Sequence, residues 1–138
     1  MNRLLVTALG VAIATTPAAI LLPQPAIAGP SSFQQTCSDI KVTVAGGKAT
    51  ITASCAKANG QKIPASLAIK YVTNSNGVLT LNPQDADGSF AQTCYAVALD
   101  ASAKLTARCK DSRGVLKPAT SLVLEDIGNF NGVLKYAK

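Results

Sequence analysis

Polar and apolar residues alternate along several short stretches of the chain. The stretches "KATITASC" (48–55) and "KLTARC" (104–109) each place every second residue, including a cysteine, on one face. A period of two is typical of half-buried β-strands. Helical periodicity is weak throughout. The pattern therefore predicts an all-β protein, with inward positions at Ala49, Ile51, Ala53, Cys55, Leu105, Ala107 and Cys109.

Turn signals separate these stretches and predict hairpins. Gly46-Gly47 lies between the β-prone run "KVTV" and residues 48–55, and residues 100–102 take the matching place in "AVALDASAKL". Further along, "SLAIKYV" (66–72) and "SLVLEDI" (121–127) each alternate like a strand and lead to an Asn-Gly turn and a second short strand, with a short turn or 3₁₀ piece near Thr73 or Asp126 as the alternative. Asn-Gly is a strong hairpin signal because both residues tolerate positive φ. We expect Pro64 and Pro118 to lie in loops.

The first 28 residues have the features of a secretory signal peptide. Arg3 precedes an apolar run over 4–22, and Ala26-Ile27-Ala28 forms a small-x-small cleavage signal. A membrane anchor is the rival reading, but Pro17 and the cleavage signal favour removal after Ala28. We expect a secreted product, extracellular or periplasmic, with a single domain over 29–138. No second apolar run of membrane length follows, so no membrane insertion is expected once the signal is removed.

All four cysteines lie in the predicted mature chain, which favours disulfides in a small secreted domain. A zinc site is the alternative, but the chain has no histidine and no close Cys-x-x-Cys spacing. We therefore expect neither a metal site nor another cofactor.

Charge and residue types narrow the function further. Without Arg3, 12 of the 13 basic residues remain against 7 acidic ones, a net charge of +5. The lysines are spread along the sequence, whereas nucleic-acid binding favours a clustered patch. The absence of histidine excludes Ser-His and Cys-His catalysis, and adjacent Glu125 and Asp126 would point to opposite faces of a strand. We therefore expect that the protein has no nucleic-acid partner and is not an enzyme.

The chain also repeats itself. "FQQTC" (33–37) recurs as "FAQTC" (90–94), and "NSNGVL" (74–79) recurs as "NFNGVL" (129–134). Two copies of one plan, over 33–85 and 90–138, predict two tandem pseudo-symmetric repeats joined by the polar segment 82–89. Four cysteines allow three pairings. Only the pairing Cys37–Cys55 with Cys94–Cys109 treats both repeats alike and keeps each bridge within one hairpin.

These duplicated motifs, together with "NFNGVLKYA" near the end of the chain, closely resemble the cyanovirin-N homology family. The resemblance covers residues 33–138. It implies a lectin in which each repeat builds a sheet and a hairpin and strands are exchanged between the repeats. The expected partners are mannose-rich oligosaccharides or glycoproteins, and the protein is expected to be a monomer or a domain-swapped dimer.

The resemblance also implies two carbohydrate sites, each joining the Gln-Thr of one repeat to the Asn-Gly turn of the other. Amide and hydroxyl side chains suit this role because they donate and accept hydrogen bonds to sugar hydroxyls. Turn chemistry alone would also explain Asn76 and Asn131. The first site would use Gln35, Thr36, Asn129, Phe130 and Asn131, and the second Asn74, Ser75, Asn76, Gln92, Thr93, Lys110, Asp111 and Ser112.

The loop after the second cysteine differs between the repeats. In the first repeat it reads Ala56, Lys57 and Ala58, so two of its three side chains cannot form hydrogen bonds. Since the family often has polar residues there, we expect the second site to bind more tightly. The alternative function is a secreted, disulfide-stapled interaction or inhibitor domain that binds no sugar.

Overall fold

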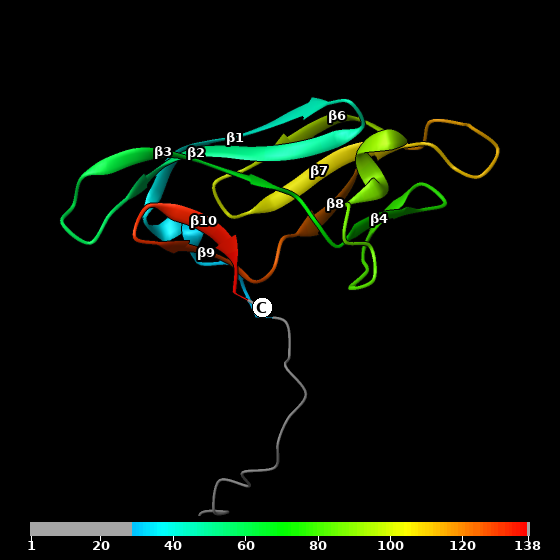
Figure 1. Ribbon diagram of the computed structural model, residues 1–138. Helices are drawn as coiled ribbons and strands as arrows, with labels where there is room; N and C mark the ends of the chain where they lie inside the picture. Colours follow the sequence, from blue (N-terminus) through cyan, green and yellow to red (C-terminus); the bar gives the residue numbers. More distant parts are fainter. Residues whose placement is uncertain (1–28, 138) are drawn as a thin grey trace, which may run out of the picture.

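The computed structural model describes residues 29–137 and has the predicted all-β architecture (Figure 1). Two three-stranded sheets have the orders β1-β2-β3 and β6-β7-β8, and two hairpins, β4-β5 and β9-β10, accompany them. The elements of the first repeat are η1 (Phe33–Gln35), β1 (Cys37–Ala45), β2 (Lys48–Ala56), β3 (Lys62–Ala68), β4 (Val72–Ser75) and β5 (Val78–Leu81). Those of the second are η2 (Ser89–Gln92), β6 (Cys94–Leu99), β7 (Lys104–Cys109), β8 (Thr120–Val123), β9 (Ile127–Phe130) and β10 (Val133–Tyr136).

The strands are exchanged between the repeats, as the resemblance implied. The β9-β10 hairpin of the second repeat lies beside η1 and the β1-β2-β3 sheet, while the β4-β5 hairpin of the first repeat lies near η2 and β8 (Figure 1). Side-chain hydrogen bonds cross at both places, from Asn129 to Thr36 and from Asn74 to Thr93. Each half of the molecule therefore contains residues from both repeats.

The core of each half is built on the predicted inward positions. Ile51 in β2 and Leu105 in β7 are both fully buried, and so are Phe33 and Phe90 at the start of each repeat. The two phenylalanines belong to the short 3₁₀ helices η1 and η2, which the sequence pattern did not locate. Each helix places the following Gln-Thr pair at the surface, beside the exchanged hairpin.

Both predicted disulfides are present. Cys37 pairs with Cys55 and Cys94 with Cys109, and no cysteine is free among residues 29–137. Each bridge joins directly opposed residues in the ladder between the first and second strands of a sheet. The bridges thus fix the register of β1 with β2 and of β6 with β7.

Two predicted strands are each divided in the structure. The run 66–72 belongs partly to β3 and partly to β4, and the run 121–127 is divided between β8 and β9. The breaks fall at Tyr71 and Asp126, which have positive φ values of 65° and 62°. A positive φ lies outside the β region of backbone conformations. At these breaks the chain leaves its own sheet and enters the hairpin that joins the other half.

The prediction that Pro64 lies in a loop was wrong. Pro64 is within β3, opposite Ser54, whereas Pro118 precedes β8 as expected. Proline cannot donate a ladder hydrogen bond, and it is tolerated here because β3 is at the edge of its sheet.

Side chains hold the two crossover segments in place. The Tyr136 hydroxyl accepts a hydrogen bond from the Lys70 backbone N–H at 2.8 Å and donates to the Lys70 carbonyl at 3.2 Å. Burial raises the pKa of Tyr136 to about 12. Asp85 accepts hydrogen bonds from the hydroxyls of Thr73 and Ser89, both at 2.6 Å. Partial burial acts to raise the pKa of Asp85, but the hydrogen bonds from Ser89 and Thr73 outweigh it and lower that pKa.

The predicted signal peptide, residues 1–28, lies outside the described residues. Within 29–137, no helix is long and apolar enough to cross a membrane.

Candidate carbohydrate-binding sites

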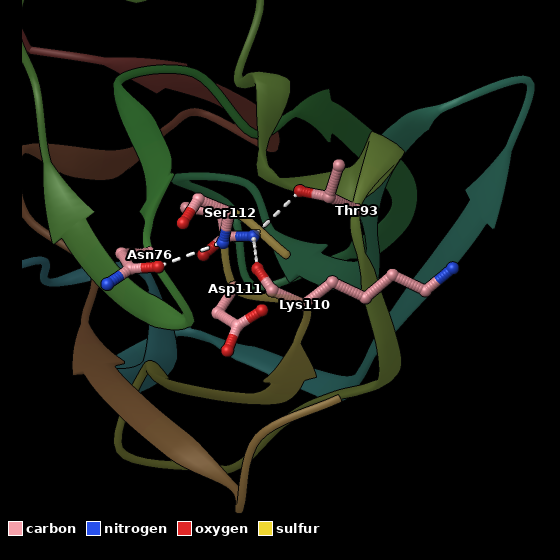
Figure 2. A pocket seen from close by; sticks show the side chains of 6 residues that line it. Asn76, Thr93, Lys110, Asp111 and Ser112 are labelled. Atoms are coloured by element: carbon pink, nitrogen blue, oxygen red, sulfur yellow. Dashed lines mark hydrogen bonds between the residues drawn. The ribbon is translucent and has the colours of Figure 1, made fainter. Parts of the chain in front are cut away.

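Each half of the molecule gathers the predicted site residues at the place where the exchanged hairpin meets the Gln-Thr pair. We call the group around Thr36, Asn129, Asn131 and loop 56–58 the first site. The group around Thr93, Asn74, Asn76 and loop 110–112 is the second site (Figure 2). In both, the threonine directly follows a 3₁₀ helix. One asparagine, Asn74 or Asn129, lies in the first strand of the hairpin, and the other, Asn76 or Asn131, lies in its two-residue turn.

In the second site, one asparagine fixes the geometry of the threonine. The Asn74 side-chain amide donates to the Thr93 hydroxyl oxygen and to the Lys110 carbonyl, both at 2.8 Å (Figure 2). Its oxygen accepts from the Gly77 N–H, also at 2.8 Å. Both amide hydrogens are thus used within the protein. Because Thr93 accepts from Asn74, its own hydroxyl hydrogen stays available to a ligand.

The first site repeats this arrangement with residues from the opposite repeats. Asn129 donates to the Thr36 hydroxyl and to the Ala56 carbonyl, both at 2.9 Å, and accepts from the Gly132 N–H at 2.8 Å. Asn74 and Asn129 were predicted to contact the sugar. Their hydrogen bonds add a second role, because they position the threonine and the loop.

A second asparagine in each turn holds the neighbouring loop. The Asn76 side-chain oxygen accepts from the Ser112 N–H at 2.9 Å, and that of Asn131 accepts from the Ala58 N–H at 2.8 Å. Both have the positive φ that a tight Asn-Gly turn requires, 50° and 53°. Turn chemistry and site chemistry therefore coincide. Since a backbone N–H can only donate, the side-chain NH₂ groups lie on the other side and remain free to donate.

The second site contains a shallow pocket of about 280 Å³. Its lining comprises six of the eight residues predicted for this site, namely Asn74, Asn76, Thr93, Lys110, Asp111 and Ser112 (Figure 2). The other two, Ser75 and Gln92, are exposed but do not line it. Gln92 instead lies against Gly47 at the β1-β2 turn, where an added Cβ would be 3.2 Å from its Cγ.

Two residues predicted for the first site lie less centrally. Gln35 is exposed at the end of η1. Phe130 follows Asn129 in β9, and alternate side chains of a strand point to opposite faces. Its ring lies over Gly128, with the Lys135 ammonium 4.5 Å from the ring centroid, and it is 43% exposed. Phe130 thus belongs to the outer face of the hairpin.

One residue pair next to the sites was missed from the sequence. Each turn glycine is covered by a side chain from the opposite repeat, Lys117 over Gly77 and Ile63 over Gly132. An added Cβ would lie 2.5 Å from Lys117 at Gly77 and 2.6 Å from Ile63 at Gly132. The spacing of 54 residues that relates Cys55 to Cys109 also relates position 63 to 117, so aligning the repeats would have revealed this pair.

The free groups suit polar, uncharged or acidic ligands. Both sites offer a threonine hydroxyl and an asparagine NH₂ at the surface, and the second adds the Ser112 hydroxyl. Among residues 29–137 no group of three His, Cys, Asp or Glu side chains is placed to hold a metal ion.

Comparison with known proteins assigns the chain and its fold to one family. The CVNH domain matches residues 33–135. The chain therefore belongs to the CVNH family, the cyanovirin-N homologues. The T. borchii protein TbCVNH is similar to it, with 26% identity over 76% of this chain and 98% of that one and a TM-score of 0.63.

Two further solved structures share the fold. Microvirin, solved as a complex with mannobiose, has 25% identity over 78% of this chain and 98% of its own, with a TM-score of 0.58. The N. crassa protein NcCVNH has 22% identity over 78% and 99%, with a TM-score of 0.61.

Proposed function

We propose that this protein is a secreted lectin that binds mannose-rich oligosaccharides or glycoproteins through two shallow polar sites, the second being the tighter. The observation that carries the proposal is the duplicated arrangement of hydrogen bonds around Thr93 and Thr36. Two separate regions of the sequence build the same surface from opposite repeats, and each leaves a threonine hydroxyl and an asparagine NH₂ free. The microvirin complex supports mannose as the sugar.

The difference between the sites lies in side chains that face outward. In both sites the loop supplies the same two backbone groups, a carbonyl to one asparagine and an N–H to the other. Only the second loop adds hydrogen-bonding side chains, where the first has Ala56 and Ala58. A sugar hydroxyl left without a partner costs roughly 1–3 kcal/mol. One such loss weakens binding by about tenfold or more.

Secretion rests on the N-terminal sequence pattern. Export would remove residues 1–28 and supply the oxidising environment in which the two disulfides form. N-terminal sequencing of the exported protein should begin at Gly29. We propose that the mature protein is a monomer or a domain-swapped dimer and acts without a metal ion or catalytic activity.

Calorimetry with a mannose disaccharide tests the function, using Asn76→Gly and Asn131→Gly as a matched pair. Glycine keeps the positive φ of each turn and removes only the side chain. We expect Asn76→Gly to weaken binding by about tenfold or more and Asn131→Gly to change it little. A chelator should leave the affinity unchanged.

The outcomes separate the proposal from its alternative. If the folded protein binds no mannose-terminated glycan on an array, the disulfide-stapled interaction or inhibitor domain becomes the better description. If Asn131→Gly abolishes binding while Asn76→Gly preserves it, the protein is a lectin but the ranking of its sites is reversed.

A further inference from the structure

The wall of the second site is strongly basic, although the sequence shows no run of basic residues. Segment 108–117 contains four basic side chains and a single acidic one, Asp111. The corresponding segment of the first repeat, 54–63, contains only Lys57 and Lys62. The four basic residues of the second site are Arg108, Lys110, Arg113 and Lys117.

All four lie at or next to the pocket. Lys110 lines it, and its side chain extends away from Asn76, Asp111 and Ser112 (Figure 2), with the ammonium 5.1 Å from the Tyr95 ring centroid. Lys117 covers Gly77, next to the pocket residue Asn76. Arg108 donates to the Lys117 carbonyl at 3.2 Å. The Arg113 guanidinium is 4.0 Å from the carboxylate of Asp111, another lining residue.

Asp111 offsets one of the four positive charges, which leaves segment 108–117 with a net charge of +3. One of its oxygens accepts from the N–H groups of Arg113 and Val115, at 2.9 and 3.0 Å. Its side chain is only 6% exposed, whereas that of Arg113 is 82% exposed. The carboxylate is therefore committed to its own loop, while the guanidinium faces solvent.

The hydrogen bonds within the pocket also favour an acidic ligand. The side-chain oxygens of Asn74 and Asn76 and the Lys110 carbonyl all accept from protein groups. The Asn76 NH₂ and the hydroxyl hydrogens of Thr93 and Ser112 donate to no described residue. A neutral sugar hydroxyl must place its own hydrogen on an acceptor, but an ionised oxygen only accepts. This pocket is rich in donors, and so it suits an acidic ligand.

We infer that the second site binds a glycan with an anionic substituent, a phosphate, sulfate or carboxylate, next to the sugar in the pocket. This inference rests on the proposed lectin function. The sugar occupies the pocket, and the substituent reaches the basic rim formed by Lys110 and Arg113. Charge-assisted hydrogen bonds to such groups are about twice as strong as neutral ones.

The test compares a neutral mannose disaccharide with the same disaccharide carrying a phosphate, a sulfate or a uronic carboxylate. Binding to residues 29–138 is measured by calorimetry at low and high salt. We expect at least one anionic form to bind about tenfold or more tightly at low salt. High salt should reduce that advantage and leave the neutral disaccharide nearly unaffected, because screening acts only on the charged ligand. The three arms identify the acidic group that is recognised.

Matched variants locate the effect. The double variant Lys110→Gln with Arg113→Gln should remove most of the anionic advantage, which is the ratio of the affinity for the anionic disaccharide to that for the neutral one. Lys41→Gln with Lys104→Gln removes the same charge outside the pocket lining and should leave the advantage intact. Circular dichroism checks that both variants are folded.

Three results would overturn the inference. The first is equal affinity for neutral and anionic disaccharides, which leaves the lectin proposal standing. The second is an equal loss in both double variants. The third is equally tight binding of a single-stranded oligo-dT, which would mean that net charge alone attracts polyanions. If the unmodified protein binds neither the neutral nor the anionic disaccharides, the lectin function itself is refuted.

Discussion

The two sites have the same internal support but different walls. Thr36 and Thr93 are each held by an asparagine from the opposite repeat, with matching hydrogen-bond partners and distances that agree within 0.1 Å. Around this support, Ala56, Ala58 and Ile63 in the first site correspond to Lys110, Ser112 and Lys117 in the second. The backbone and buried amides keep the symmetry of the duplication, and the outward side chains have lost it. Differences in recognition should therefore arise from the walls.

The largest expected effect is the loss of stability on removing a disulfide. It tests whether the two halves depend equally on their disulfides for stability. The disulfides close segments with sequence separations of 18 and 15 residues. In the loop-closure model each contributes about 3 kcal/mol. We expect the variants Cys37→Ala/Cys55→Ala and Cys94→Ala/Cys109→Ala to lose similar amounts of unfolding free energy in urea titrations. A loss confined to one variant would show that the halves differ in more than their walls.

A second comparison uses variants that lack the asparagine holding the threonine in each site. Asn74→Ala would leave the Lys110 carbonyl and the Gly77 N–H without their partner, and Asn129→Ala would do the same to Ala56 and Gly132. Unsatisfied groups of this kind cost roughly 1–3 kcal/mol. Thermal unfolding should show comparable losses for both variants. Affinity for the mannose disaccharide should fall markedly only for Asn74→Ala, and the opposite pattern would reverse the ranking of the sites.

Alkaline pH should reduce the stability of the protein through Tyr136, which lies in the β9-β10 hairpin. Tyr136 has a pKa of about 12 in the folded protein, against roughly 10 when unfolded. Its contribution is fully present below pH 10 and is lost as the pH rises toward 12, by about 2 kcal/mol. Tyr136→Phe should therefore lose less stability than the unmodified protein over this interval. Urea titrations at both ends of this pH interval measure the unfolding free energy. An equal decrease in the variant and in the unmodified protein would contradict this expectation.

The smallest effect comes from making the first wall resemble the second. Ala58→Ser introduces the hydroxyl found at Ser112 on a loop already fixed by Asn131. One added neutral hydrogen bond contributes about 1 kcal/mol, or severalfold in affinity. We expect that gain in calorimetry on an Asn76→Gly background, where the second site is weakened. Ala58→Gly is the matched control, and an equal gain from it would exclude the hydroxyl as the cause.

The sequence predicted the features that depend on local pattern. Alternation placed Ile51 and Leu105 inward, Gly46-Gly47 and the two Asn-Gly pairs marked their turns, and the repeated spacing gave both disulfides. The exchange of strands came from the family resemblance. Periodicity could not supply it, because alternation within a strand does not indicate which sheet the strand joins.

The misses depend on contacts between distant segments. Tyr71 and Asp126 interrupt runs that alternate like continuous strands, and tertiary contacts hold their positive φ. The Tyr71 N–H donates to the Asp85 carbonyl, and that of Asp126 to the Gly29 carbonyl. In the same way, the sequence did not indicate that Asn74 and Asn129 also position a threonine and a loop. Their role in positioning appears only when the partners of each amide hydrogen are known.

The strand exchange also sets an order in which the two sites can be assembled. Asn74 and Thr93 are 19 residues apart in the chain, whereas Asn129 and Thr36 are 93 apart. Bringing the more distant pair together costs about 1.4 kcal/mol more in loop-closure entropy. During synthesis from the N-terminus, the second site is complete once loop 110–112 has emerged, while the first must wait for the last hairpin. The first site can therefore be completed only after the last hairpin has emerged, whereas the second site, which we propose to be the tighter one, can form earlier.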